Sequence, residues 1–304
     1  MRLAIAALLV TATLPAADLT NPVWSPDFHV RDPAVVPVTG GYDVYFSRYR
    51  FGEWKDPANW TIGRVFTKDF STFEDRGDVS PTGFASPARP VTWHGRQILA
   101  YQRYPSKPVE LVYATSTDGA VWSAPTTFLS DANQLAWNTR KRVIDPTLVV
   151  DGDRLVCFFV GTTDKDMQIN LVGVAETRDP DLKSWTIVSR ETPLIGPVPG
   201  VPDGAENIDV LRDGDHWTMI FSRGLRNQHL AYGVSKDLLT WDFRGDLPLT
   251  PQPWMARRYG APSVWKEGDT WRMLLMGEDP KAVARVGLLS SPDGIAWTLL
   301  PAAP

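Results

Sequence analysis

Five dipeptides, each opening a short run of β-branched residues, recur along the chain at intervals of 54 to 61 residues. They are Asp32-Pro33, Ser86-Pro87, Asp145-Pro146, Glu206-Asn207 and Ala261-Pro262. A regular period of this length is the signature of one supersecondary unit repeated around a ring. Three of the first positions are carboxylates, which a ring brings together at its axis. Because Ser86 and Ala261 occupy the same position, the repeat itself requires no acid there, and we attribute the acids to chemistry.

Each dipeptide is followed by two predicted strands joined by a turn that contains glycine, which supplies the positive φ of a tight hairpin. A second signature closes each repeat, an aspartate followed four residues later by an aromatic residue: Asp69 and Phe73, Asp118 and Trp122, Asp181 and Trp185, Asp237 and Trp241, Asp293 and Trp297. The aspartate caps a turn, and the aromatic ring is predicted to fill the gap between neighbouring sheets. Each aspartate is preceded by a further strand. Four strands in each of five repeats predict an all-β fold, a five-bladed β-propeller with four antiparallel strands per blade.

The first 17 residues are typical of a secretory signal peptide. They contain the single charge of Arg2, an apolar run from Leu3 to Val10 and small residues at 16 and 17. We therefore expect residues 1–17 to be a signal peptide and residues 18–304 to be one propeller domain, in a secreted or periplasmic protein. Since no later segment holds eighteen uninterrupted apolar residues, we expect no membrane span.

Composition narrows the class of partner. The formal net charge is −4, and no block of Lys or Arg provides a footprint for nucleic acid. The only cysteine, Cys157, lies in an apolar run and is interpreted as a core residue rather than a reactive thiol. The thirteen tryptophans favour a protein that stacks sugar rings. We expect a monomer that acts on an oligosaccharide or polysaccharide.

The three acids suit glycoside hydrolysis. That reaction needs one protonated carboxyl group, which donates to the leaving oxygen, and one ionised carboxylate, which activates water or attacks carbon. Clustered acids in a partly dry cavity push their pKa values apart, so that one group stays protonated while another is ionised.

The motifs Val30-Arg31-Asp32-Pro33 and Val143-Ile144-Asp145-Pro146, with Glu206 at the start of the fourth repeat, resemble the catalytic set of glycoside hydrolase family 43. Members of that family are five-bladed enzymes that process arabinan and xylan. The resemblance covers essentially the whole mature chain. It implies that Asp32 is the general base, that Asp145 tunes and orients the acid, and that Glu206 is the general acid of an inverting, exo-acting enzyme cleaving arabinofuranosyl, xylosyl or galactosyl units. The chain departs from the family after Glu206, where Asn207-Ile208 replaces a small residue and proline, and Asp209 is a fallback for the acid.

Further candidates follow from the topology. The end of the second strand returns to the face that carries the acids, which makes Arg48, Arg103 and Arg223 candidate substrate-binding residues. Trp54, Trp60, Trp137 and Trp254 lie in connections expected to rim that face, where their rings are candidate sugar platforms. No cofactor is required. Some members of the resembled family hold a calcium ion at the axis, and His229 is the candidate ligand for such a structural calcium here.

Two other functions are compatible with the same residues. A non-catalytic carbohydrate-binding propeller would use the acids only to hydrogen-bond hydroxyl groups, and a glycoside phosphorylase would use the three arginines to bind phosphate. The same arginines would suit an anionic sugar.

Overall fold

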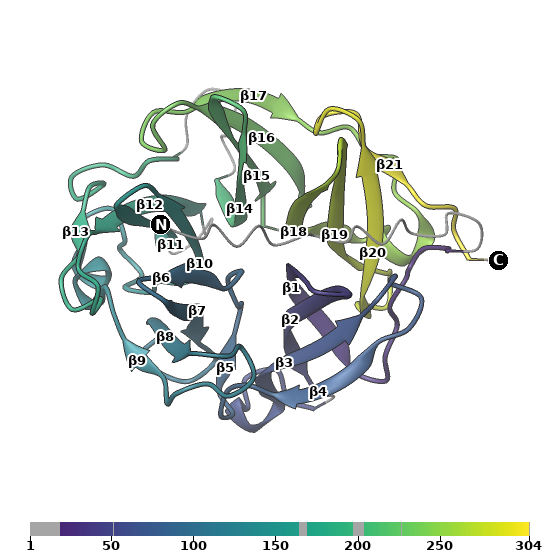
Figure 1. Ribbon diagram of the computed structural model, residues 1–304, viewed down its shortest axis with the longest axis horizontal. Coiled ribbons are helices and arrows are strands. Elements are labelled where there is room, and N and C mark those ends of the chain that lie inside the picture. The colour runs from purple at the N-terminus through teal and green to yellow at the C-terminus, as the bar shows by residue number, and fades with distance from the viewer. Residues whose placement is uncertain (1–18, 51, 164–168, 197–203, 226, 304) are drawn as a thin grey trace, which may run out of the picture.

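Five antiparallel sheets surround a central axis in the computed structural model, which describes residues 19–50, 52–163, 169–196, 204–225 and 227–303 (Figure 1). The predicted five-bladed all-β propeller is confirmed. The expected signal peptide lies outside the described residues. Among the described residues, no helix combines the length and hydropathy needed to cross a membrane.

Each blade runs from an inner to an outer strand in chain order. The blades comprise β1 (His29–Val38), β2 (Gly41–Tyr49), β3 (Trp60–Thr67) and β4 (Glu74–Asp78); β5 (Phe84–Ala85), β6 (Val91–Trp93), β7 (Arg96–Arg103), β8 (Leu111–Ser116) and β9 (Thr126–Thr127); β10 (Ile144–Asp151), β11 (Arg154–Thr163), β12 (Ile169–Thr177) and β13 (Thr186–Ile187); β14 (Ala205–Asp213), β15 (His216–Arg223), β16 (His229–Ser235) and β17 (Asp242–Asp246); and β18 (Arg258–Glu267), β19 (Thr270–Glu278), β20 (Ala284–Ser291) and β21 (Thr298–Leu299). Three short 3-10 turns, η1 (Pro57–Asn59), η2 (Ser130–Gln134) and η3 (Pro253–Met255), lie in the connections.

The inner strand of the second blade is divided into β5 and β6, both of which pair with β7. Pro87 and Pro90 lie between the two pieces. Because proline has no N–H to donate to a ladder, pairing stops there and resumes at Val91.

All five inner strands carry the same irregularity near their start. Asp32, Ser86, Asp145, Asn207 and Ala261 have φ between 47° and 50°, in the left-handed region. The β-ladder shifts register at this point in the first, third, fourth and fifth blades. Such a bulge re-aims the side chains beside it. The fourth repeat was therefore misaligned by one residue in our sequence analysis: Asn207, not Glu206, is equivalent to the other acids. Ile208 stands where the other repeats have proline, which hid the correct alignment.

The closing aromatic residue of each repeat packs between two blades, as predicted. Phe73 packs between the fifth and first blades, and Trp122, Trp185, Trp241 and Trp297 pack at the four successive interfaces. The aspartate four residues earlier accepts turn N–H groups in four repeats. The third repeat is an exception, because Asp179 rather than Asp181 accepts the N–H groups of Lys183 and Ser184.

The ring closes where the N-terminal and C-terminal segments meet beside the fifth blade (Figure 1). Asn21 pairs with Ala302, and Trp24 pairs with Val286 of β20. The buried Asn21 side chain also brackets Leu288: its Nδ2 donates to the Leu288 carbonyl at 3.1 Å, and its Oδ1 accepts from the Leu288 N–H at 2.8 Å. The first described residues are thus fastened to the last blade.

Candidate active site

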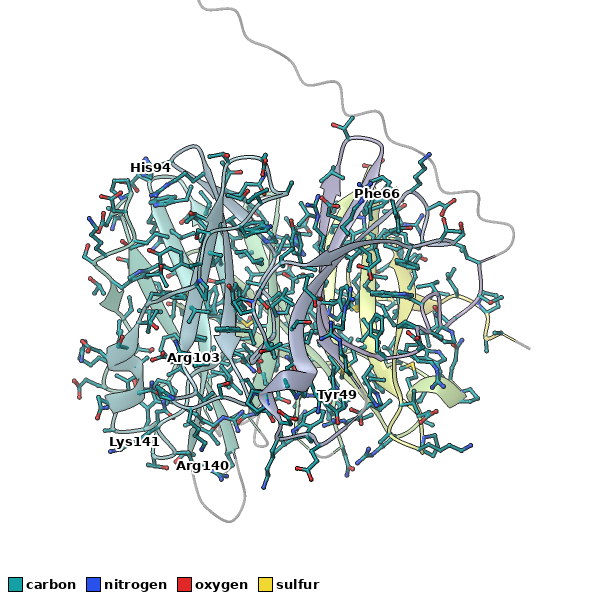
Figure 2. All side chains as sticks on the ribbon, turned by 90° about the horizontal axis from the view of Figure 1, so that it is seen from below. Tyr49, Phe66, His94, Arg103, Arg140 and Lys141 are labelled. Carbon is teal, nitrogen blue, oxygen red and sulfur yellow. The ribbon has the colours of Figure 1, made fainter. Side chains whose placement is uncertain are left out.

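The starts of the inner strands and the ends of the second strands lie on one face of the disc, as the repeat topology predicts. Figure 2 shows His94, in the hairpin before β7, at the opposite face from Tyr49, which ends β2. Arg103, at the end of β7, lies toward the same face as Tyr49.

A pocket of about 150 Å³ lies at the axis on this face. Asp32, Asp145 and Glu206 all line it, so the three predicted acids are brought together. A cavity of about this volume holds one benzene-sized ring. The pocket therefore takes about one ring beside the acids, and further sugar units would lie outside its open mouth.

Asp32 is fixed by side chains from three blades. The Ser47 hydroxyl donates to its Oδ2 at 2.7 Å, and the Ser86 hydroxyl donates to the same oxygen at 3.2 Å. Asn207 Nδ2 lies 3.5 Å from Oδ1. The serine hydroxyls also connect the blades, because Ser47 Oγ accepts the Ser86 N–H at 2.6 Å. The carboxyl group therefore has one orientation, which is what a group that must aim a water molecule needs.

Asp145 is the most deeply placed of the three acids, with 7% of its surface exposed. Its backbone N–H donates to Gln102 Oε1 of the second blade at 2.7 Å. The Ser86 N–H donates to Ser47 of the first blade in the same way. Burial raises the pKa of Asp145 well above its usual range, and the negative charges of Glu206 and Asp32 raise it further. The hydroxyl of Ser86 and the charge of Arg142 act in the opposite direction.

Glu206 is more exposed than Asp145 and is held by two amides. Gln228 Nε2 donates to its Oε1 at 2.6 Å, and Asn170 Nδ2 donates to its Oε2. Burial raises the pKa of Glu206; Arg142 and Arg258 lower it, and Asp32 raises it. Because Asp145 and Glu206 both have raised pKa values and repel each other, the pair favours holding one proton between them.

Sequence reasoning missed three arginines that line the pocket, Arg31, Arg142 and Arg258. Arg31 and Arg258 both pair with Glu278, a fully buried residue at the end of β19, and the Arg258 bond is 2.6 Å long. Arg257 pairs with the other oxygen of Glu278 at 3.2 Å. The available signal was position: Arg31 immediately precedes Asp32, while Arg142 and Arg258 each stand three residues before the left-handed residue of their blade.

The structure places Arg48, Arg103 and Arg223 away from the pocket, which corrects the prediction that they bind substrate. They pair with acids on the strands further out or beside them, Asp75 at 2.9 Å, Glu110 at 3.2 Å and Asp246 at 2.6 Å, respectively. Successive side chains of a strand point to opposite sides. The residues just before these arginines, Ser47, Gln102 and Ser222, are the ones that reach the left-handed position of the next blade.

Of the four predicted tryptophan platforms, Trp60 lines the pocket but is buried, whereas Trp54 lines the pocket and is exposed. Its side chain is 40% exposed, the Arg31 guanidinium lies 4.8 Å from its ring centroid, and its Nε1 donates to the Tyr104 hydroxyl at 2.7 Å. Trp137 and Trp254 instead pack over Gly161 and Gly277, where the absence of a side chain leaves room for an indole ring. They are core residues at equivalent places in the third and fifth blades.

His229 is not placed as a metal ligand. Its Nδ1 lies 3.0 Å from the carbonyl of Asn227, and its Nε2 lies 3.3 Å from Asp246. Within the part of the chain that the structure describes, no three His, Cys, Asp or Glu side chains are grouped to hold a metal ion. The side chains around His229 do not fit the calcium site that the family resemblance implied.

Asp209, the fallback acid, lies deeper along the axis. It lines a narrow channel of about 40 Å³. In every blade, the residue two positions beyond the left-handed residue lines this channel, and in the fourth blade that residue is Asp209. Its Oδ2 accepts from Arg89 Nη2 at 2.5 Å and from the Val264 N–H at 2.5 Å. This pair joins the second, fourth and fifth blades below the pocket. Asp209 is therefore a structural group, and Glu206 remains the candidate acid.

Solved structures with the same fold include glycoside hydrolases. A thermostable family-43 glycoside hydrolase is 16% identical, with 94% of this chain and 98% of that chain covered at a TM-score of 0.71. The α-L-arabinofuranosidase of Podospora anserina in complex with cellotriose is 14% identical, covering 89% and 95% at 0.65. The α-L-arabinanase of Cellvibrio cellulosa complexed with arabinohexaose is 14% identical, covering 87% and 92% at 0.63. Neither a protein-family model nor a curated protein sequence matches the chain. At these identities the likeness is one of fold, and it confirms the family-43-like propeller at that level.

Proposed function

We propose that this protein is an exported, exo-acting glycoside hydrolase of the inverting type, acting on an oligosaccharide or polysaccharide. The observation that carries the proposal is the convergence of Asp32, Asp145 and Glu206 from three blades into one small pocket. Export is supported by the sequence pattern of residues 1–17 alone. The relatives in fold that were solved with cellotriose or arabinohexaose support a carbohydrate as the substrate.

The assignment of roles follows from exposure and proton affinity. A general acid must touch the leaving oxygen and must carry a proton near neutral pH. Glu206 is the best candidate for this role, because it is more exposed than Asp145 and burial raises its pKa above the usual value. Asp145 lies behind it, and its negative charge when ionised would favour the protonated form of Glu206. Asp32 takes the remaining role, the base that removes a proton from the attacking water.

The chemical step needs only these residues. Water is placed by Asp32 on one side of the anomeric carbon, and Glu206 protonates the glycosidic oxygen on the other side. The new carbon–oxygen bond forms as the old one breaks, and one proton passes to Asp32 while another leaves Glu206. For such an inverting arrangement the two carboxyl groups should lie about 6.5 to 9.5 Å apart, which leaves room for the water.

The test is a hydrolysis screen of arabinan, xylan and galactan oligosaccharides, run with and without phosphate, with the released sugar followed by proton NMR. We expect a single monosaccharide to appear without phosphate and with inverted anomeric configuration at early times. Binding without turnover would instead establish the non-catalytic carbohydrate-binding alternative. A strict requirement for phosphate would establish a phosphorylase, although the arginines on which that alternative depended, Arg48, Arg103 and Arg223, lie outside the pocket.

A further inference from the structure

Arg142 brings a guanidinium group into the pocket that makes no direct ion pair with a described residue, although its charge acts on Asp145 and Glu206 from a distance. It precedes β10 and lines the pocket beside Asp145. Its Nε is buried without a hydrogen-bond partner, and no ion pair to its guanidinium is found within the described residues. A buried polar group without a partner is destabilising, and a buried charge more so. A group of this kind in a pocket indicates a ligand that supplies the missing acceptor.

The other two arginines that line the pocket have an ion-pair partner, although their Nε atoms, like that of Arg142, are buried without an acceptor. Arg31 and Arg258 share the buried carboxylate of Glu278 with Arg257, so that three guanidinium groups face one carboxylate. Asp32 accepts from two hydroxyls, and Glu206 accepts from two amides. With one proton on the Asp145–Glu206 pair, four arginines, Arg257 behind the pocket included, face three negative charges: Glu278, Asp32 and the ionised member of the pair. The imbalance favours an anionic ligand over a neutral one.

We propose that the sugar unit bound in this pocket carries an anionic substituent, a carboxylate or a sulfate ester, and that Arg142 binds it. The proposal rests on the glycosidase function proposed above. A guanidinium presents two parallel N–H donors, which match the oxygens of either anion better than a lysine ammonium does. The pocket volume leaves room for one such sugar.

Arg142 has a competing role that the test must separate. Its charge also lowers the pKa values of Asp145 and Glu206. A residue that acted only on the acids would affect neutral and anionic substrates equally and would shift the pH profile on both. A residue that binds the substituent would affect anionic substrates alone.

The first part of the test compares matched substrates. Wild-type protein is offered 4-nitrophenyl galactosides, galacturonides and galactoside 6-sulfates of both anomers, together with neutral, uronate-containing and sulfated oligosaccharides. We expect turnover of an anionic member to exceed that of its neutral partner by about 10-fold or more in kcat/KM, the discrimination expected for one charged hydrogen-bonded contact. A preference for the galacturonide identifies a carboxylate, and a preference for the 6-sulfate identifies a sulfate. Equal or better turnover of the neutral partner overturns the proposal.

The second part uses variants on the preferred anionic substrate. Arg142→Gln should lower kcat/KM by about 10- to 100-fold, mostly through KM, with Arg142→Lys recovering part of the loss. The control is Arg190→Gln, at an exposed arginine that does not line the pocket, which should change the turnover of neither substrate. An equal loss on the neutral partner with a shifted pH profile overturns the proposal in favour of the acid-tuning role.

If no glycoside is hydrolysed, the proposed function fails, and a binding experiment tests this inference separately. Calorimetry compares the affinities of the protein for galacturonate and for galactose. Equal affinities overturn the inference.

Discussion

The effect of substituting Asp32 or Glu206 should depend differently on the leaving group of the substrate, so single substitutions test the two roles. Asp32→Asn removes the base and should lower kcat by about 10²-fold or more on every substrate, because no leaving group compensates for an unactivated water. Glu206→Gln should be nearly as damaging on a natural glycoside and much milder on an aryl glycoside with an acidic phenol. Since the raised pKa of Glu206 sets the alkaline limit, Glu206→Gln should also abolish the fall in kcat at high pH. Full activity of Asp32→Asn on the aryl glycoside would rule out the base assignment.

Asp145 is a buried carboxyl beside two other acids, and its ionisation opposes folding. Its pKa is raised in the folded protein, so the folded state binds the proton more tightly than the unfolded chain. The wild-type protein therefore loses stability as pH rises from the unfolded pKa, about 4, through the folded pKa. Asp145→Asn should match the wild type at low pH and exceed its Tm by a few degrees at neutral pH, since about 1 kcal/mol shifts the Tm of a large domain by about 2 °C. Asp153→Asn, in the exposed β10–β11 turn, is the control. A Tm gain that does not grow with pH would contradict the argument.

At the scale of the element, the bulge at the start of the inner strand is held by a side chain of the preceding blade in the second, third and fifth blades. Ser47 accepts the N–H of Ser86 and donates to Asp32, whereas Ser222 accepts the N–H of Ala261 at 2.8 Å in a blade without an acid at this position. Ser47→Ala and Ser222→Ala each leave a buried N–H without its partner and should each lower the free energy of unfolding by about 1–3 kcal/mol. Only Ser47→Ala should also lower kcat several-fold, because it frees Asp32 to rotate. Urea titration and steady-state kinetics on both variants provide the comparison. Equal losses of kcat would show that the effect is general loosening.

The same element shows which parts of the site the sequence could predict. Asp32 and Asp145 were placed correctly because proline follows each, so their phase was visible. Asn207 was misaligned because Ile208 replaces that proline. The arginines of the second strands were misassigned because position along a strand does not tell which side a residue faces, and a shift of one residue reverses it. Arg142 and Arg258 were missed because the bulge that follows them brings their side chains to the axial pocket, and the sequence pattern does not show that bulge.

At the scale of the whole molecule, the repeat predicted the number of blades and the aromatic wedges because both follow from local patterns that recur. How the ring closes follows no such pattern. The contacts of Asn21 with Leu288 span 267 residues, and the two segments that meet beside the fifth blade belong to no repeat (Figure 1). The short outer strands, two residues in β9, β13 and β21, were likewise beyond prediction because their length depends on the neighbouring loops.

Asn21 provides the test of this closure. Its side chain, 1% exposed, makes both a donor and an acceptor contact with Leu288, and its N–H donates to the Pro301 carbonyl at 2.7 Å. Asn21→Ala should lower the free energy of unfolding by about 1–3 kcal/mol, because it removes two hydrogen bonds and leaves the buried Leu288 N–H unsatisfied, while the Leu288 carbonyl keeps the Leu300 N–H at 3.4 Å. The axial pocket lies in the middle of the disc, so kcat well below Tm should be unchanged. Hydrogen exchange should show loss of protection concentrated in β20 and β21, where the N-terminal segment is fastened. Asp27→Ala, a substitution at an exposed residue of the same segment, is the control. A uniform loss of protection across all five blades would show that the ring opens as one unit rather than at this closure.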